Sequence, residues 1–122
     1  MSNQKLLIVE DNADNLKLVS WILEDEGFDF DAAMSGEECL QALENQQYAL
    51  VLLDISLPGI DGKDVALKIR QHPELSSLPI VACTAHAIKQ EEAAIWDSGV
   101  NEIITKPIDE AELLSCLRKY LQ

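Results

Sequence analysis

The chain of 122 residues has little of what secreted, fibrous or membrane proteins need. Its three cysteines (Cys39, Cys83 and Cys116) are an odd number without paired spacing, which indicates reduced core thiols in a cytosolic protein rather than a disulfide framework. Five glycines and four prolines exclude collagen-like and low-complexity composition. The longest apolar runs, such as residues 49–53, are too short to span a bilayer, and residues 1–4 do not resemble a signal peptide.

Basic residues are also scarce. Nine Lys and Arg stand against 22 Asp and Glu, giving a formal charge of -13. Binding to nucleic acid or to an anionic membrane uses clustered Lys and Arg, so neither is expected as a partner. Most of the carboxylates provide solubility, and the remaining question is whether a few of them converge.

What the sequence does contain is an alternation of two hydrophobic patterns. Nearly continuous apolar runs, typical of strands buried on both faces, occupy residues 6–9, 28–33, 49–53, 80–83 and 102–104. Helical spacing follows each run, over residues 14–26, 36–45, 62–71, 87–97 and 109–121. Gly27 and Gly99 stand where helices end, and Asp109 stands where one begins. This pattern predicts one α/β domain, residues 1–122, with a parallel sheet between two helical layers.

Polar side chains follow four of the five apolar runs, at the point where each strand ends. These are, in chain order, Glu10-Asp11, Asp54, Thr84 and Lys106-Pro107. Because ligands of open α/β sheets bind beyond the carboxyl ends of the strands, we expect these side chains to share one site. An acid directly after a five-residue apolar strand, as at Asp54, has little structural reason to be there.

The chemistry of this predicted site follows from its residue types. Three carboxylates repel one another unless a cation lies among them, and oxygen ligands without His or Cys favour Mg²⁺. A lysine and a threonine hydroxyl beside that ion could bind an anion with several oxygens. A carboxylate can itself be the nucleophile that forms an acyl phosphate. The site is therefore suited to placing a phosphoryl group on an aspartate.

Four stretches of the sequence resemble the receiver domains of two-component response regulators. They are VEDN at residues 9–12, LDISLPGIDG at 53–62, CTA at 83–85 and TKP at 105–107. The resemblance covers nearly the whole chain and implies the flavodoxin-like (βα)5 fold, a three-layer sandwich with strand order 2-1-3-4-5.

The resemblance also implies a role for each site residue. Asp54 would be the phosphoacceptor, and Mg²⁺, with Mn²⁺ able to substitute, would be bound by Glu10, Asp11, Asp54 and the main-chain carbonyl of Ser56. Thr84 and Lys106 would bind the phosphoryl oxygens, and the Lys106–Pro107 bond would be cis. The partners would be a histidine kinase or histidine phosphotransfer protein and a downstream protein target. We expect a cytoplasmic phosphoacceptor domain and not an enzyme with a separate substrate.

Two departures from the family pattern concern the conformational change on phosphorylation and the rate of dephosphorylation. The family often has an aromatic residue three positions before the lysine, and this residue turns inward with the threonine on phosphorylation. This chain has Ile103 at that position, and an aliphatic side chain cannot make the same rotamer exchange. Ser56 and His86 stand where the family tunes dephosphorylation.

The sequence argues against three other functions. A phosphatase of the haloacid dehalogenase type needs a second aspartate two residues after the nucleophile, where this chain has Ser56. A flavin or nucleotide binder needs a glycine-rich phosphate loop after the first strand, and residues 59–63 lack the P-loop spacing. A phosphate-independent receiver-like module would be expected to lose the acids or the lysine. We expect a stand-alone response regulator, the alternative being a receiver excised from a hybrid histidine kinase.

Three further features of the sequence concern the surface of the molecule. Trp21 lies off the apolar stripe of its helix, so its ring either covers a neighbouring helix or is an exposed anchor for a partner. Residues 93–96 are more apolar than a sheet-facing stripe requires, which suggests a docking face. His72, before a proline, is expected to be a solvated loop residue.

Overall fold

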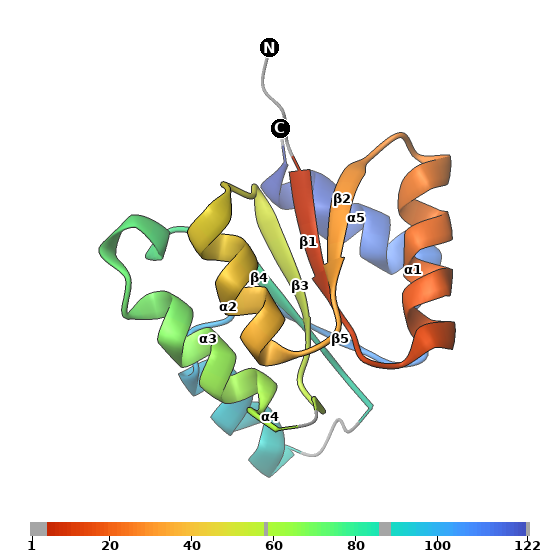
Figure 1. Ribbon diagram of the computed structural model, residues 1–122. Coiled ribbons are helices and arrows are strands. Elements are labelled where there is room, and N and C mark those ends of the chain that lie inside the picture. The colour runs from red at the N-terminus through yellow and green to blue at the C-terminus, as the bar shows by residue number, and fades with distance from the viewer. Residues whose placement is uncertain (1–4, 58, 86–88, 122) are drawn as a thin grey trace.

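The computed structural model describes residues 5–57, 59–85 and 89–121 (Figure 1). The strands are β1 (Lys5–Val9), β2 (Asp29–Ala33), β3 (Leu50–Asp54), β4 (Ile80–Thr84) and β5 (Glu102–Thr105). The helices are α1 (Ala13–Asp25), α2 (Gly36–Asn45), α3 (Gly62–Arg70), α4 (Lys89–Asp97) and α5 (Glu110–Tyr120), with a 3-10 turn η1 (Pro73–Leu75). Each predicted strand and helix is present, and the described bounds differ from the predicted ones by at most two residues.

The five strands form one parallel sheet in the order β2-β1-β3-β4-β5, as the resemblance implied. Helices α1 and α5 cover one face, and α2, α3 and α4 cover the other (Figure 1). Alternate residues of β1 therefore enter two different cores: Leu6 and Ile8 pack towards α1 and α5, while Leu7 and Val9 pack towards α2 and α3. Burial on both faces explains the continuous apolar runs in the sequence.

The ends of the helices are fixed by local polar contacts. The side chains of Asn12, Ser35, Asp61 and Asp109 each accept a hydrogen bond from a backbone N–H in the first turn of α1, α2, α3 and α5. Gly27 and Gly99 have φ of 81° and 101°, a conformation that glycine adopts without strain. The predicted N-cap at Asp109 and both predicted glycine positions are confirmed.

The turn η1 was not predicted, because three residues that begin at a proline are too few to show a helical period. Pro58, in the predicted loop beside the site, and residues 87 and 88, at the predicted start of the fourth helix, lie outside the described residues. The Lys106–Pro107 peptide bond is cis, as the resemblance implied. The three cysteines are free thiols, as predicted.

The parallel arrangement brings the carboxyl ends of all five strands to one edge of the sheet, which we call the carboxyl edge (Figure 1). The register aligns these ends closely, since Val9 pairs with Leu53, Asp54 with Cys83, and Thr84 with Thr105. The opposite edge is called the amino edge. Among the described residues, none of the helices is long and apolar enough to cross a membrane.

Candidate functional site

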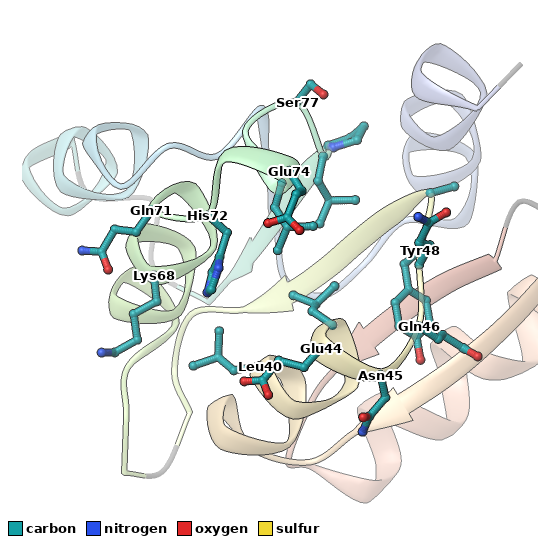
Figure 2. Close-up of a pocket in the computed structure, with 16 residues that line it drawn as sticks. Leu40, Glu44, Asn45, Gln46, Tyr48, Lys68, Gln71, His72, Glu74 and Ser77 are labelled. Atoms are coloured by element: carbon teal, nitrogen blue, oxygen red, sulfur yellow. The ribbon is translucent and has the colours of Figure 1, made fainter.

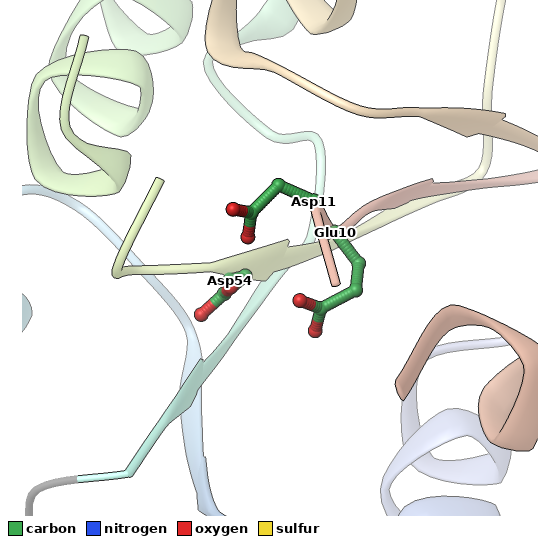
Figure 3. Close-up of side chains that lie close together, drawn as sticks. All are labelled: Glu10, Asp11 and Asp54. Carbon is green, nitrogen blue, oxygen red and sulfur yellow. The ribbon is translucent and has the colours of Figure 1, made fainter. Parts of the chain in front are cut away.

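Three carboxylates meet at the carboxyl edge (Figure 3). Glu10 and Asp11 follow β1, Asp54 ends β3, and one oxygen from each carboxylate lies within 4.8 Å of the others. Glu10 and Asp54 are only 3% and 4% exposed, whereas Asp11 is exposed. The predicted acidic site is therefore assembled with two carboxylates in the protein interior and one at its mouth.

Lys106 supplies the positive charge of this site. It follows β5, and its Nζ lies 3.0 Å from Glu10 Oε1 and 3.2 Å from Asp54 Oδ1. The lysine side chain is 17% exposed, so these ion pairs are partly shielded from water. One ammonium thus bridges the two most buried carboxylates, which lie on separate strands.

Backbone N–H groups fix the same two carboxylates. The N–H of Asn12 donates to Glu10 Oε2 at 3.1 Å, and the N–H of Ser56 donates to Asp54 Oδ1 at 3.2 Å. Sequence reasoning missed both contacts, since every non-proline residue carries a backbone N–H and no side-chain pattern marks these two. Each carboxylate is held in one orientation before any ligand arrives.

The electrostatics of the site follow from burial and from the neighbouring carboxylates. Burial raises the pKa of Asp54, the adjacent Glu10 carboxyl raises it further, and Lys106 opposes both effects without cancelling them. Burial alone would lower the pKa of Lys106, but the Glu10 and Asp54 carboxylates outweigh it, so its pKa lies above the ordinary value. Negative charge exceeds positive charge at this site, which favours binding of a further cation.

The donor set fits a hard divalent cation. It consists of carboxylate oxygens, with no described His or Cys ligand beside them, which suits Mg²⁺ better than zinc. A second group of acids, Asp25, Glu26 and Glu110, also has oxygens close together. All three are exposed, and Glu26 pairs with Arg118 at 3.0 Å, so this group has none of the burial seen at the carboxyl edge.

The remaining predicted site residues lie around the acids. Thr84 ends β4 and is 4% exposed, and Ser56 lies in the loop after β3 with an exposed side chain. Ile103 is half-buried on β5 against the core shared with α4. His86 lies outside the described residues.

The two predicted surface features are also visible. Trp21 is 67% exposed, so its ring does not lie buried over a neighbouring helix, and its role as a partner anchor stays a prediction. On α4, Ala93 and Ala94 are exposed and Trp96 is 43% exposed, while Ile95 is buried. The excess apolar surface predicted for this helix is therefore present.

A pocket of about 1120 Å³ opens at the amino edge, between the ends of α2 and α3 and the turn η1 (Figure 2). The exposed His72 lines it, in agreement with its predicted place in a solvated loop. Tyr48 forms part of the wall, and its hydroxyl donates to Asp31 at 2.6 Å. None of the predicted site residues lines this pocket, which lies at the end of the strands opposite the acidic cluster.

Comparisons with known proteins agree with this geometry. Residues 6–118 match the family described as "Response regulator receiver domain". The chain is 39% identical over 119 residues to the sensor protein GacS of Pseudomonas syringae pv. syringae, a match that covers 95% of this chain and 13% of GacS. It is 33% identical over 118 residues to the polar-differentiation response regulator DivK of Brucella ovis, covering 97% of this chain and 96% of DivK.

A solved structure with the same fold is the receiver domain of the sensor histidine kinase PA1611 from Pseudomonas aeruginosa. It superposes with a TM-score of 0.91 at 29% identity, over 98% of both chains. That structure has a magnesium ion coordinated in its active site cleft.

Proposed function

This chain belongs to the response regulator receiver family, and from that membership and the site geometry we propose that Asp54 accepts a phosphoryl group from a phosphohistidine donor in a Mg²⁺-dependent reaction. The single observation that carries the proposal is the position of Lys106, whose ammonium lies within 3.2 Å of both Glu10 and Asp54. A cation held against the nucleophile can neutralise the oxygens of an incoming phosphoryl group.

The roles of the residues follow from their places in the site. An Asp54 carboxylate oxygen attacks phosphorus, a P–O bond forms, and the P–N bond to the donor imidazole breaks. The released imidazole nitrogen takes a proton from water. Lys106 and the Thr84 hydroxyl bind phosphoryl oxygens, at the ends of the two strands that follow β3 in the sheet.

The metal residues are Glu10, Asp11, Asp54 and the main-chain carbonyl of Ser56. Mg²⁺ bound there supplies charge neutralisation and orientation for phosphoryl oxygens, and Mn²⁺, which prefers similar oxygen ligands, should substitute. The excess of carboxylate over ammonium charge supports this assignment, as does the magnesium in the PA1611 receiver domain.

The partners are proposed from the family and the relatives. A histidine kinase or a histidine phosphotransfer protein donates the phosphoryl group, and the phosphorylated chain docks on a downstream protein or passes the group onward. The match over 96% of DivK suits a separate response regulator, and the match over 13% of GacS suits a receiver within a sensor kinase. Three free thiols suit a reducing compartment, so we place the reaction in the cytoplasm.

The proposal is tested by phosphorylation with a small phosphodonor such as phosphoramidate in the presence of Mg²⁺. We expect one added phosphoryl group by intact mass, sensitive to hydroxylamine, and none in Asp54→Asn, because an amide is a poor nucleophile. Asp64→Asn, which removes an exposed carboxylate from the first turn of α3, is the matched control and should label like the wild type. Full labelling of Asp54→Asn would move the acceptor elsewhere. Measuring phosphotransfer from each histidine kinase of the host to the wild-type chain would identify the donor.

A further inference from the structure

Arg70, the last residue of α3, holds three segments of the chain together. Its Nε donates to the carbonyl of Gly99 at 2.9 Å, and its two terminal nitrogens donate to the Leu75 carbonyl at 2.8 Å and to Asn101 Oδ1 at 2.9 Å. Hydrogen bonds from a guanidinium are stronger than those between neutral groups. The end of α3, the turn η1 and the connection from α4 to β5 are therefore joined by one side chain.

The connection from α4 to β5, residues 98–101, is also fastened to the sheet. Asn101 Oδ1 accepts from the Ile80 N–H at 2.8 Å, and the Asn101 N–H donates to the Ile80 carbonyl at 2.7 Å. Ser98 is 2% exposed, and its hydroxyl donates to the carbonyl of Ile95. We call residues 98–101 the α4–β5 turn. It is held from α3, from β4 and from α4 itself.

The body of α4 is attached far less firmly. Of its side chains that the structure describes, residues 92–97, Ile95 is the one that is buried. Ala93, Ala94 and Trp96 are exposed, and no ion pair in the described part of the chain involves these six residues. Helix stability in proteins comes mainly from packing of an apolar face, and residues 92–97 contribute one buried side chain to such packing, so this described part of α4 does little to hold the helix in one orientation.

The two ends of α4 lie at opposite edges of the sheet (Figure 1). Its first residue, Lys89, comes five positions after Thr84 at the carboxyl edge, and its last residue leads into the α4–β5 turn towards the amino edge. The near end of α4 is therefore close in sequence to Thr84, while Arg70 contacts the turn that follows the far end.

We propose that Arg70 makes the α4–β5 turn a fixed pivot, so that phosphorylation at the carboxyl edge rotates α4 about its C-terminal end instead of sliding the helix along the sheet. This inference rests on the proposed function, since it needs a phosphoryl group on Asp54. A sliding helix would carry Gly99 and Asn101 with it and break their contacts with Arg70. A pivoting helix preserves those contacts and moves most at residues nearest the site.

The test uses NMR of the wild-type chain with Mg²⁺, with and without beryllofluoride as a phosphoryl mimic. The Arg70 Nε–Hε signal reports directly on the bond to Gly99. We expect this signal and the amides of residues 98–101 to be unchanged, and amide shift changes along α4 to decrease from residue 92 to residue 97. Shifts at Arg70 Nε–Hε and Asn101 as large as those at residue 92 would overturn the pivot. A failure of the proposed function looks different, because then Asp54 and its neighbours would not respond to beryllofluoride.

Two glycines provide a matched pair of variants. A Cβ at Gly99 would lie 2.8 Å from Arg70 Cγ, whereas a Cβ at Gly27 would meet nothing within 4 Å, and both residues have positive φ. Gly99→Ala and Gly27→Ala therefore carry the same kind of backbone strain, but only Gly99→Ala displaces Arg70. With beryllofluoride, Gly99→Ala should extend the shift changes through residues 98–101, and Gly27→Ala should give the wild-type gradient. Identical gradients in both variants would contradict the role of Arg70, and Arg70→Gln repeats the test without backbone strain.

Discussion

At the scale of single residues, the charge balance of the site depends on Lys106. Its ammonium contacts both Glu10 and Asp54, two carboxylates that are almost fully buried. Removing one member of a buried charged cluster costs more than the pair contributes, because the remaining charges stay desolvated. We therefore expect the lysine to stabilise the fold, in addition to the phosphoryl-binding role proposed for it.

This leads to the first prediction. Lys106→Met should lower the free energy of unfolding in EDTA by about 3 kcal/mol, and Mg²⁺ should restore part of the loss by replacing the missing charge. Lys119→Met is the control, because Lys119 also pairs with a carboxylate, Glu102, but its side chain is 64% exposed. Exposed pairs are screened by water and contribute little, so Lys119→Met should lower the free energy of unfolding far less than Lys106→Met. Urea unfolding of both variants measures the difference, and equal losses would show that burial does not set the contribution of Lys106.

The second prediction concerns the thiols. Burial raises the pKa of Cys39 and of Cys83 to about 12, and that of Cys116 to about 11. At pH 8 a thiol with a pKa near 12 is ionised to about one part in ten thousand, and only the thiolate reacts. Native protein should therefore react slowly with Ellman's reagent, first at the half-buried Cys116, and should release three equivalents at once in urea. Rapid native labelling at Cys39 or Cys83 would contradict this burial.

Single residues also show what the sequence could and could not predict. Asp54, Thr84 and Lys106 were predictable because each follows an apolar run whose end must lie at the carboxyl edge of a parallel sheet. The contacts of Arg70 were not, since they join residues 29 and 31 positions apart without any repeating pattern. Side-chain periodicity reveals which face of an element is buried, and not which donor meets which carbonyl.

At the scale of elements, the approach of α3 to β3 positions Asp54. A Cβ at Gly62, the first residue of α3, would lie 2.6 Å from the Asp54 carbonyl and 2.6 Å from Ile55 Cα. These neighbours are backbone atoms that cannot rotate away. The glycine therefore allows the helix to start directly against the strand end that carries Asp54.

The third prediction follows from this contact. Gly62→Ala should destabilise the chain by about 2 kcal/mol and slow labelling of Asp54, because the strand end must move. Gly36→Ala is the matched control: its Cβ would meet the side chains of Ile60 and Val65 at 2.5 Å and 2.6 Å, away from Asp54. That variant should lose stability while keeping its rate of phosphorylation by phosphoramidate. Equal labelling rates in both variants would show that Gly62 does not position Asp54.

The elements themselves were predictable to within two residues, because both sheet faces are buried and each helix has a capping residue or a terminal glycine. The exception, η1, is too short to show a period and is held by Arg70 and by the backbone bond from Leu75 N–H to His72. Such a turn depends on tertiary contacts that a local pattern does not contain.

At the scale of the whole molecule, the formal charge of -13 opposes the compact state. Monovalent salt screens this repulsion over about 10 Å at 0.1 M, so added KCl should stabilise the chain. A gain on the order of 1 kcal/mol would raise Tm by about 4 °C for a domain of this size. This stabilisation by monovalent salt acts on the whole chain and does not require binding at the acidic cluster.

The fourth prediction separates this screening from binding at the site. At matched ionic strength, Mg²⁺ should raise Tm further in the wild type and not in Asp11→Ala, which lacks the exposed acid of the cluster. Asp14→Ala, which removes an exposed acid from the first turn of α1, is the control and should keep the Mg²⁺ effect. Thermal unfolding in KCl and in MgCl₂ measures both quantities. A persistent Mg²⁺ effect in Asp11→Ala would remove that residue from the metal site.

The parallel sheet also determines how the chain can be attached to other objects. Lys5, at the start of β1, and Tyr120, at the end of α5, both lie at the amino edge, while Asp54 lies at the carboxyl edge (Figure 1). A linker to a chip, a bead or a fluorescent protein at either terminus therefore points away from the acids and Lys106. If the proposed function is correct, the chain immobilised through one end or the other keeps the edge that carries Asp54 turned away from the support, as a surface-bound sensor of phosphotransfer requires.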